Sequence, residues 1–216
     1  MKRQLKKVVC LALITSMILG QKTLKTTKNV TAKEKKDIKI AIDAGHQARG
    51  NFATEPVGPG SSTRKAKVAG GATGVASHVP EYKLTLAVSK KLQKELKARG
   101  YKVYMIRTKN NVNISNKKRA QLANKSGADI YIRIHADSSN SRAVTGASGL
   151  YPSKANKYVS KLSTKSKKLS SCLLKSYCKK TKIRNRGLVA RDDLTGTNWT
   201  RAVWMRRRSP KSAAQG

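Results

Sequence analysis

The chain has 216 residues, and its 48 lysines and arginines outnumber its 10 acidic residues, giving a formal net charge of +38. This length suits one domain of ordinary size with appendages, and it suffices to bury a hydrophobic core. The charge predicts attraction to a polyanion, although a lysine-rich surface without a specific partner explains it equally well. Nucleic acid is not expected, because the sequence contains no RNA-binding or zinc-finger signature.

The N-terminal segment resembles a secretory signal. Residues 1–7 are basic and residues 8–19 form an apolar run, which is typical of such signals. The run is short for a membrane span, which takes roughly 20 apolar residues. Residues 1–20 are therefore expected to be a signal peptide or, because Ile18 fits a cleavage site poorly, an uncleaved anchor. Both alternatives predict export, and only the anchor predicts membrane association.

Residues 21–37 are rich in lysine and threonine and nearly devoid of apolar residues, which predicts a flexible linker. The segment that follows alternates short apolar runs with amphipathic stretches. In chain order it predicts a strand at 39–43, a helix at 80–98, a strand at 101–107, a helix at 114–126 and a strand at 129–135. This alternation predicts one α/β domain over residues 38–200, with an open, mostly parallel sheet and helices on both faces.

Further elements are expected at 149–151 and 187–190 as strands and at 157–180 as a helix, whereas residues 47–79 are expected to form a long loop without regular structure. Cys172 and Cys178 lie on the last of these helices, about 9 Å apart at ~1.5 Å per residue. That separation exceeds the ~7 Å limit for a disulfide. Both cysteines are therefore predicted to be packing residues.

Two histidines lie where ligands bind in parallel sheets, at the carboxyl ends of strands. His46 follows the first predicted strand and His135 closes the third. Glu81 begins the first helix and extends a stripe expected to face the core, formed with Leu84, Val88, Leu92 and Leu96. A buried carboxylate requires a partner or a metal, although a glutamate in the first turn is also favoured by the helix dipole. Two histidines and one carboxylate match a catalytic zinc site with one position left for water.

Four segments of the sequence resemble the zinc-dependent N-acetylmuramoyl-L-alanine amidases, the cell-wall hydrolases of the LytC/AmiC type (amidase_3 domain). They are IAIDAGH at 40–46, EYKLTLAV at 81–88, NKKRAQLAN at 116–124 and ADIYIRIHA at 128–136. The resemblance implies that His46, Glu81 and His135 bind Zn²⁺. It also implies that the enzyme cleaves the amide between N-acetylmuramic acid and L-alanine, outside the cell and associated with the wall.

The end of the chain departs from that resemblance. The family carries a second glutamate, the general base and acid, on its last strand, but no acidic residue follows Asp193 here. Residues 201–216 are rich in arginine and show neither strand alternation nor a helical stripe. The last strand and helix of the family are therefore expected to be missing, and Asp192 and Asp193 are weak candidates for the base.

Two functions follow from these observations. One is a peptidoglycan amidase, impaired in this chain because the glutamate is absent. The other is a non-catalytic, polycationic protein that binds peptidoglycan and anionic wall polymers.

Overall fold

The computed structural model describes residues 34–139, 144–194 and 202–210. The predicted signal or anchor and most of the predicted linker lie outside these residues. Within the described ranges, no helix is both long enough and apolar enough to cross a membrane.

Six strands form the main sheet, in the order β4–β1–β5–β8–β6–β7. They are β1 (Lys39–Ala44), β4 (Lys102–Met105), β5 (Ile130–Ser139), β6 (Gly146–Pro152), β7 (Asn185–Arg191) and β8 (Ala202–Pro210). Neighbouring strands are parallel except for β6 and β8, which are antiparallel. The predicted open, mostly parallel sheet is confirmed.

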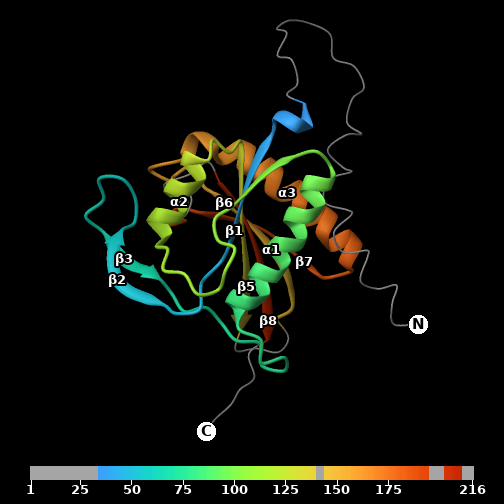
Figure 1. The fold of residues 1–216 in the computed structure, drawn as a ribbon, viewed down its shortest axis with the longest axis horizontal. Helices are drawn as coiled ribbons and strands as arrows, with labels where there is room; N and C mark the ends of the chain where they lie inside the picture. Colours follow the sequence, from blue (N-terminus) through green and yellow to red (C-terminus); the bar gives the residue numbers. More distant parts are fainter. Residues whose placement is uncertain (1–33, 140–143, 195–201, 211–216) are drawn as a thin grey trace, which may run out of the picture.

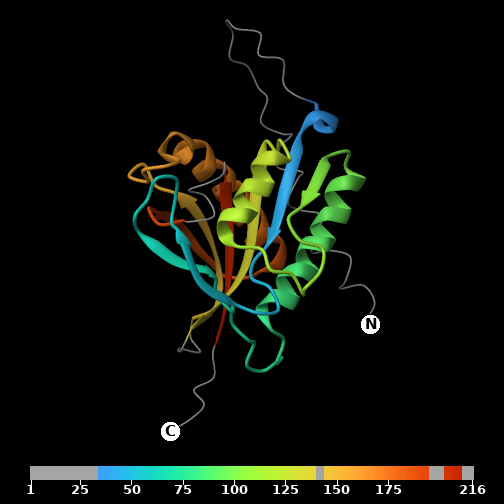
Figure 2. The same cartoon turned by 60° about the vertical axis from the view of Figure 1, so that its left-hand side comes forward.

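Helices cover both faces of this sheet, as predicted (Figure 1). They are α1 (Glu81–Ala98), α2 (Asn116–Lys125) and α3 (Ser163–Thr181). Because side chains alternate along β1, Ile40 and Ile42 pack with residues of α1 and α3, whereas Ala41 packs with Ala123 of α2 on the opposite face. The turned view in Figure 2 also shows α2 and α1 on different sides of the sheet.

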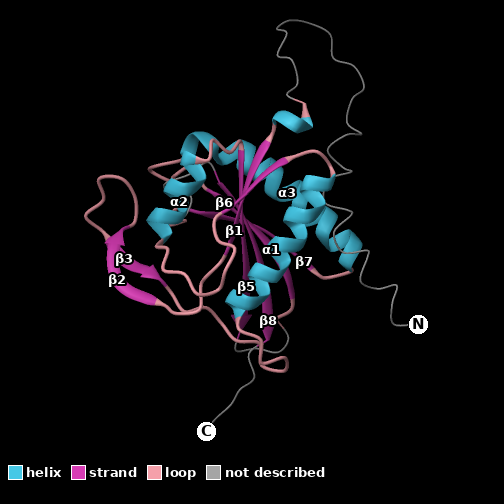
Figure 3. Cartoon of the chain, viewed as in Figure 1, coloured by secondary structure: helices cyan, strands magenta, loops and turns pink. Residues whose placement is uncertain are grey.

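A second, two-stranded sheet lies between β1 and α1 in the chain, where the sequence suggested a loop without structure. Its strands, β2 (Asn51–Pro56) and β3 (Arg64–Val68), are antiparallel, and Figure 3 shows them apart from the main sheet. Buried Glu55 on β2 accepts a hydrogen bond of 2.8 Å from the backbone N–H of Lys117 in the first turn of α2. The hairpin is thereby attached to α2, a contact between distant segments that the local pattern does not reveal.

The expectation that no strand follows Thr200 is wrong. β8 inserts between β5 and β6, parallel to the first and antiparallel to the second. Its apolar start, residues 202–205, does not alternate with polar residues. Alternation predicts strands with one solvated face, whereas a central strand covered on both faces is a continuous apolar run. The family's last helix falls outside the described residues.

The stripe expected on α1 is partly wrong. Glu81, Leu92 and Leu96 are buried, but Leu84 and Val88 are 37% and 41% exposed. The small polar residues Thr85 and Ser89 are buried in their place. The Thr85 hydroxyl donates a hydrogen bond of 2.8 Å to the carbonyl of Gly45, which satisfies one of these polar groups and ties α1 to the end of β1.

The two cysteines of α3 behave differently from each other. Both are free, as the geometric argument predicted, and Cys178 is buried. Cys172 is exposed, so the prediction that it packs in the core is wrong.

Candidate metal centre

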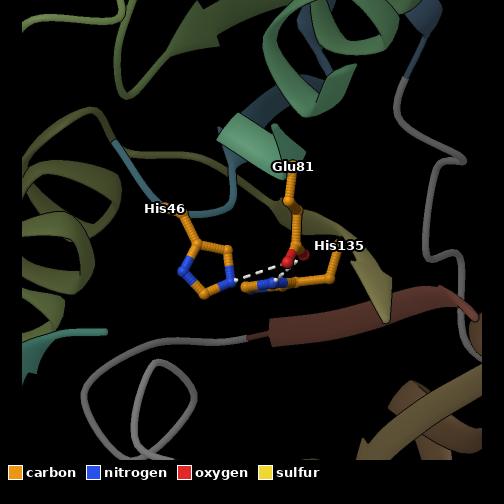
Figure 4. Close-up of side chains that lie close together, drawn as sticks. All are labelled: His46, Glu81 and His135. Carbon is orange, nitrogen blue, oxygen red and sulfur yellow. Dashed lines mark hydrogen bonds and ion pairs between the residues drawn. The ribbon is translucent and has the colours of Figure 1, made fainter. Parts of the chain in front are cut away.

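Three side chains converge at the carboxyl edge of the main sheet (Figure 4). His46 lies in the loop after β1, Glu81 is the first residue of α1, and His135 belongs to β5. One potential ligand atom from each residue lies within 4.8 Å of the others. The structure therefore brings together the three residues that the sequence singled out, across separations of 35 and 54 residues.

The carboxylate of Glu81 is held at both oxygens. Oε1 accepts a hydrogen bond of 2.8 Å from the backbone N–H of Ala136, and Oε2 accepts one of 3.0 Å from that of Ala72. Burial alone would raise the pKa of Glu81, but hydrogen bonds to His135 and His46 lower it well below its usual range. The carboxylate is therefore ionised, oriented and only 5% exposed.

The ring of His46 is oriented by the backbone. Its Nδ1 lies 2.8 Å from the carbonyl oxygen of Ala69, which can only accept, so Nδ1 carries the proton in the neutral ring. The lone pair of Nε2 then faces Oε2 of Glu81 at 3.3 Å. Two electron-rich atoms at that separation repel one another unless a cation lies between them. This arrangement fits a metal ion, whose histidine ligands usually donate their other N–H to a carbonyl or carboxylate.

His135 lies against the other oxygen of the same carboxylate. Its Nδ1 is 3.0 Å from Oε1 of Glu81, and the side chain is 9% exposed. Burial lowers the pKa of His135 to about 4. The imidazole is thus neutral near neutral pH, the form that binds metals.

Two glycines leave room for the histidine rings. A Cβ on Gly45 would lie 2.5 Å from the nearest ring atom of His135, and one on Gly71 would lie 2.9 Å from the ring of His46. Gly71 also has a φ of +85°, a conformation that favours glycine. Both glycines are therefore part of the construction of the site.

A buried network of charges lies behind the loop that carries His46. The guanidinium of Arg119 on α2 donates to Oδ1 of Asp43 at 2.6 Å, to the carbonyl of Ala44 at 3.0 Å and to the carbonyl of His46 at 2.9 Å. Arg133 pairs with the other oxygen of Asp43 at 3.1 Å. Asp43 and Arg119 are 0% exposed, so the network fixes the end of β1 without contact with solvent.

The charges of the network determine the ionisation of Asp43. Burial raises the pKa of this carboxyl, but the positive charges of Arg119 and Arg133 and a hydrogen bond from the Tyr131 hydroxyl lower it further, to below its usual value. Both Asp43 and Arg119 lie in motifs that the sequence analysis quoted, but nothing local in the sequence indicates that they meet. Their function in holding the His46 loop was therefore missed.

The weak candidates for a catalytic base do not join the three side chains. Asp192 accepts a hydrogen bond from the Ser153 hydroxyl. Asp193 is bound by the guanidinium of Arg191 at 2.5 and 2.7 Å, which lowers the pKa of Asp193. His78 is likewise absent from the described group of possible metal ligands.

Comparison with known proteins adds three similar structures. The first is the N-acetylmuramyl-L-alanine amidase Ami1 from Mycobacterium smegmatis, with a TM-score of 0.68, 20% identity, and coverage of 79% of this chain and 81% of that one. The second is an N-acetylmuramoyl-L-alanine amidase from Clostridium difficile 630, with a TM-score of 0.56, 26% identity, and coverage of 78% and 77%. The third is the catalytic domain of CwlV from Bacillus (Paenibacillus) polymyxa, with a TM-score of 0.52, 23% identity, and coverage of 78% and 79%.

No curated protein sequence shows a significant match to the chain. A family model described as N-acetylmuramoyl-L-alanine amidase, amidase_3, matches residues 40–207, a range that includes β1 and most of β8. The matched range contains all three convergent side chains. The chain belongs to the N-acetylmuramoyl-L-alanine amidase family.

Proposed function

We propose that His46, Glu81 and His135 bind Zn²⁺ in a peptidoglycan amidase. The observation that carries this proposal is the pair of electron-rich atoms, Nε2 of His46 and Oε2 of Glu81, facing each other at 3.3 Å. Ligand atoms around tetrahedral zinc are about 3.3 Å apart for bonds of about 2.0–2.1 Å. The separations of 3.3 and 3.0 Å between Glu81 and the two rings are close to that value.

Zinc bound there would supply a water of lowered pKa and would polarise the scissile carbonyl of the substrate. The residues of the chain hold and orient the ligands. Ala72 and Ala136 fix the carboxylate of Glu81 through their N–H groups, and Ala69 fixes the ring of His46. The substrate bond is the amide between N-acetylmuramic acid and L-alanine, which the family name specifies.

We further propose that proton transfer limits turnover in this chain. A positioned carboxylate typically contributes about 10² to 10⁴-fold by taking and returning protons. No acidic residue follows Asp193, and Asp193 is engaged by Arg191. In the register of β5 and β8, the residue paired with His135 is Arg206. A guanidinium has no acceptor and remains charged, so it cannot serve as the base.

The same observation supports a second candidate function, a polycationic protein that binds the wall without cleaving it. In both cases the predicted signal at residues 1–20 would direct the protein to the cell exterior. Peptidoglycan and anionic wall polymers are the proposed partners, with attraction to the polymers arising from the net charge of +38.

The test is metal content together with the release of new N-terminal alanine from purified peptidoglycan. We expect about one zinc per chain in the wild type and clearly less in Glu81→Ala and His135→Ala. Equal zinc content in all three proteins would exclude the metal site. Alanine release separates an amidase from a protein that only binds.

Restoring a carboxylate tests the proposed defect directly. Arg206→Glu should release alanine at least about a hundredfold faster than wild type, because it provides the missing proton acceptor. Arg207→Glu is the matched control, since it makes the same change of charge at the next position of β8 and pairs with Ala136. Wild-type release as fast as that of Arg206→Glu would show that proton transfer is not limiting.

A further inference from the structure

The outer surface of α3 carries an uninterrupted series of exposed basic residues. Counting along the helix in steps of three and four places Lys165, Lys168, Lys175 and Lys179 on one stripe, with exposed Cys172 in its middle. Lys161 and Lys182 continue the same spacing beyond the two ends of the helix and are also exposed. We name these six lysines the α3 ridge.

The opposite surface of α3 is buried, which fixes the direction in which the ridge faces. Leu173, Leu174 and Cys178 pack in the core, and the helix contacts β6 and β7. The helix therefore has no exposed apolar face that could insert into a lipid bilayer, as membrane-surface helices require. The ridge offers charge alone.

The charge of the ridge is not compensated nearby in the sequence. Between Asp137 and Asp192 the chain has fourteen lysines and arginines and no acidic residue. Among the described residues, the ion pairs do not include any lysine of the ridge. Like charges three and four positions apart destabilise a helix, so an external anion would relieve a repulsion that the fold itself leaves in place.

The spacing of the ridge fits an extended polymer better than a compact anion. At ~1.5 Å per residue, steps of three and four place lysines about 5 Å apart along the axis where consecutive positions are filled, and Lys165 to Lys179 spans about 21 Å. We propose that the α3 ridge binds a linear phosphate polymer with one negative charge per repeat. This inference deepens the proposed attraction to anionic wall polymers and does not depend on the amidase reaction.

The first test neutralises the ridge and measures binding to long-chain inorganic polyphosphate. The full chain with Lys165, Lys168, Lys175 and Lys179 replaced by Gln should lose at least about thirtyfold in affinity near 0.1 M salt. The slope of log K against log salt should fall by about 3, since each lysine–phosphate contact contributes roughly one unit or slightly less.

A matched variant separates the ridge from net charge. Lys83, Lys90, Lys94 and Lys97 are exposed on α1, and replacing these four by Gln removes the same charge. This control should lose less than about threefold in affinity, and replacing the four ridge lysines by Arg should preserve binding. Equal losses in the two Gln variants would overturn the proposal, because the charge of the whole protein would then be responsible.

A footprint on the wild-type surface provides a readout that needs no ridge substitution. Cys172 is exposed within the ridge, whereas Cys178 is buried and burial raises the pKa of its thiol. In a Cys10→Ser chain, polyphosphate should slow alkylation of Cys172 several-fold, and unchanged alkylation under saturating polyphosphate would contradict the inference. Ridge-dependent binding to phosphatidylglycerol vesicles, with polyphosphate binding unaffected by the substitutions, would also overturn it. Zinc content should be the same in every ridge variant, so failure of this inference is distinguishable from failure of the metal site.

Discussion

Replacing Arg119 by methionine should destabilise the protein strongly, because it strands a buried carboxylate. The Arg119 side chain is 0% exposed, and its guanidinium donates to Asp43 at 2.6 Å and to the carbonyls of Ala44 and His46. Removing one partner of a buried ion pair costs about 3–5 kcal/mol. In a protein of this size 1 kcal/mol changes Tm by about 2–4 °C, so Tm should fall by roughly 6–20 °C.

The assay is urea unfolding followed by circular dichroism, with Lys118→Met as the matched control. Lys118 is the preceding residue of α2 and is exposed, so the control removes the same charge and should change the free energy of unfolding by less than about 0.5 kcal/mol. In an Arg119→Met, Asp43→Asn double variant, the loss should be smaller than the sum of the two single losses by about 1 kcal/mol or more. A loss below about 1 kcal/mol for Arg119→Met, at an unchanged m-value, would show that Arg119 does not hold the fold through this network.

Three further predictions concern the site and its supports. Gly45→Ala should weaken zinc affinity about tenfold or more, because a Cβ there would lie 2.5 Å from the His135 ring, whereas Gly70→Ala, with no heavy atom within 4 Å of its Cβ, should not; calorimetric titration with zinc compares them. Asp43 has a folded-state pKa below its ordinary value of 3.8, so its stabilising contribution should be present above about pH 4 and be lost as the pH falls towards the folded-state pKa. Asp43→Asn should accordingly flatten the fall in stability between about pH 5 and pH 2, and parallel curves for the two proteins would contradict the assignment. Glu55→Ala should cost about 1–2 kcal/mol in urea unfolding, because the N–H of Lys117 loses its acceptor, and Glu34→Ala, at an exposed position, should be close to neutral.

The sequence was sufficient to predict the alternation of strands and helices and the residues of the candidate site. Apolar runs that end in Gly or His mark β1 and β5, and the edge rule for parallel sheets then places His46 and His135 together. Glu81 was found because it begins an apolar helix, a position that a carboxylate occupies only with a partner. These inferences use periodicity and chain order, which are local properties of the sequence.

Tertiary structure decided what depends on contacts between distant segments. The two faces of α1 differ from the expected stripe because Thr85 hydrogen-bonds to Gly45, which makes a polar residue suitable for burial. β8 forms because β5 and β6 both offer backbone groups to it, and a strand covered on both sides has no alternation to detect.

The support of the site was also beyond local reading. Asp43 and Arg119 are 76 residues apart, and a lysine-rich chain contains many cations that could have been the partner. Only the packing of α2 on the sheet selects Arg119, because it brings the guanidinium to the buried carboxylate and to the carbonyl of His46 together. The sequence thus determined which side chains carry the metal-binding chemistry, whereas the fold determined which side chains hold them in place.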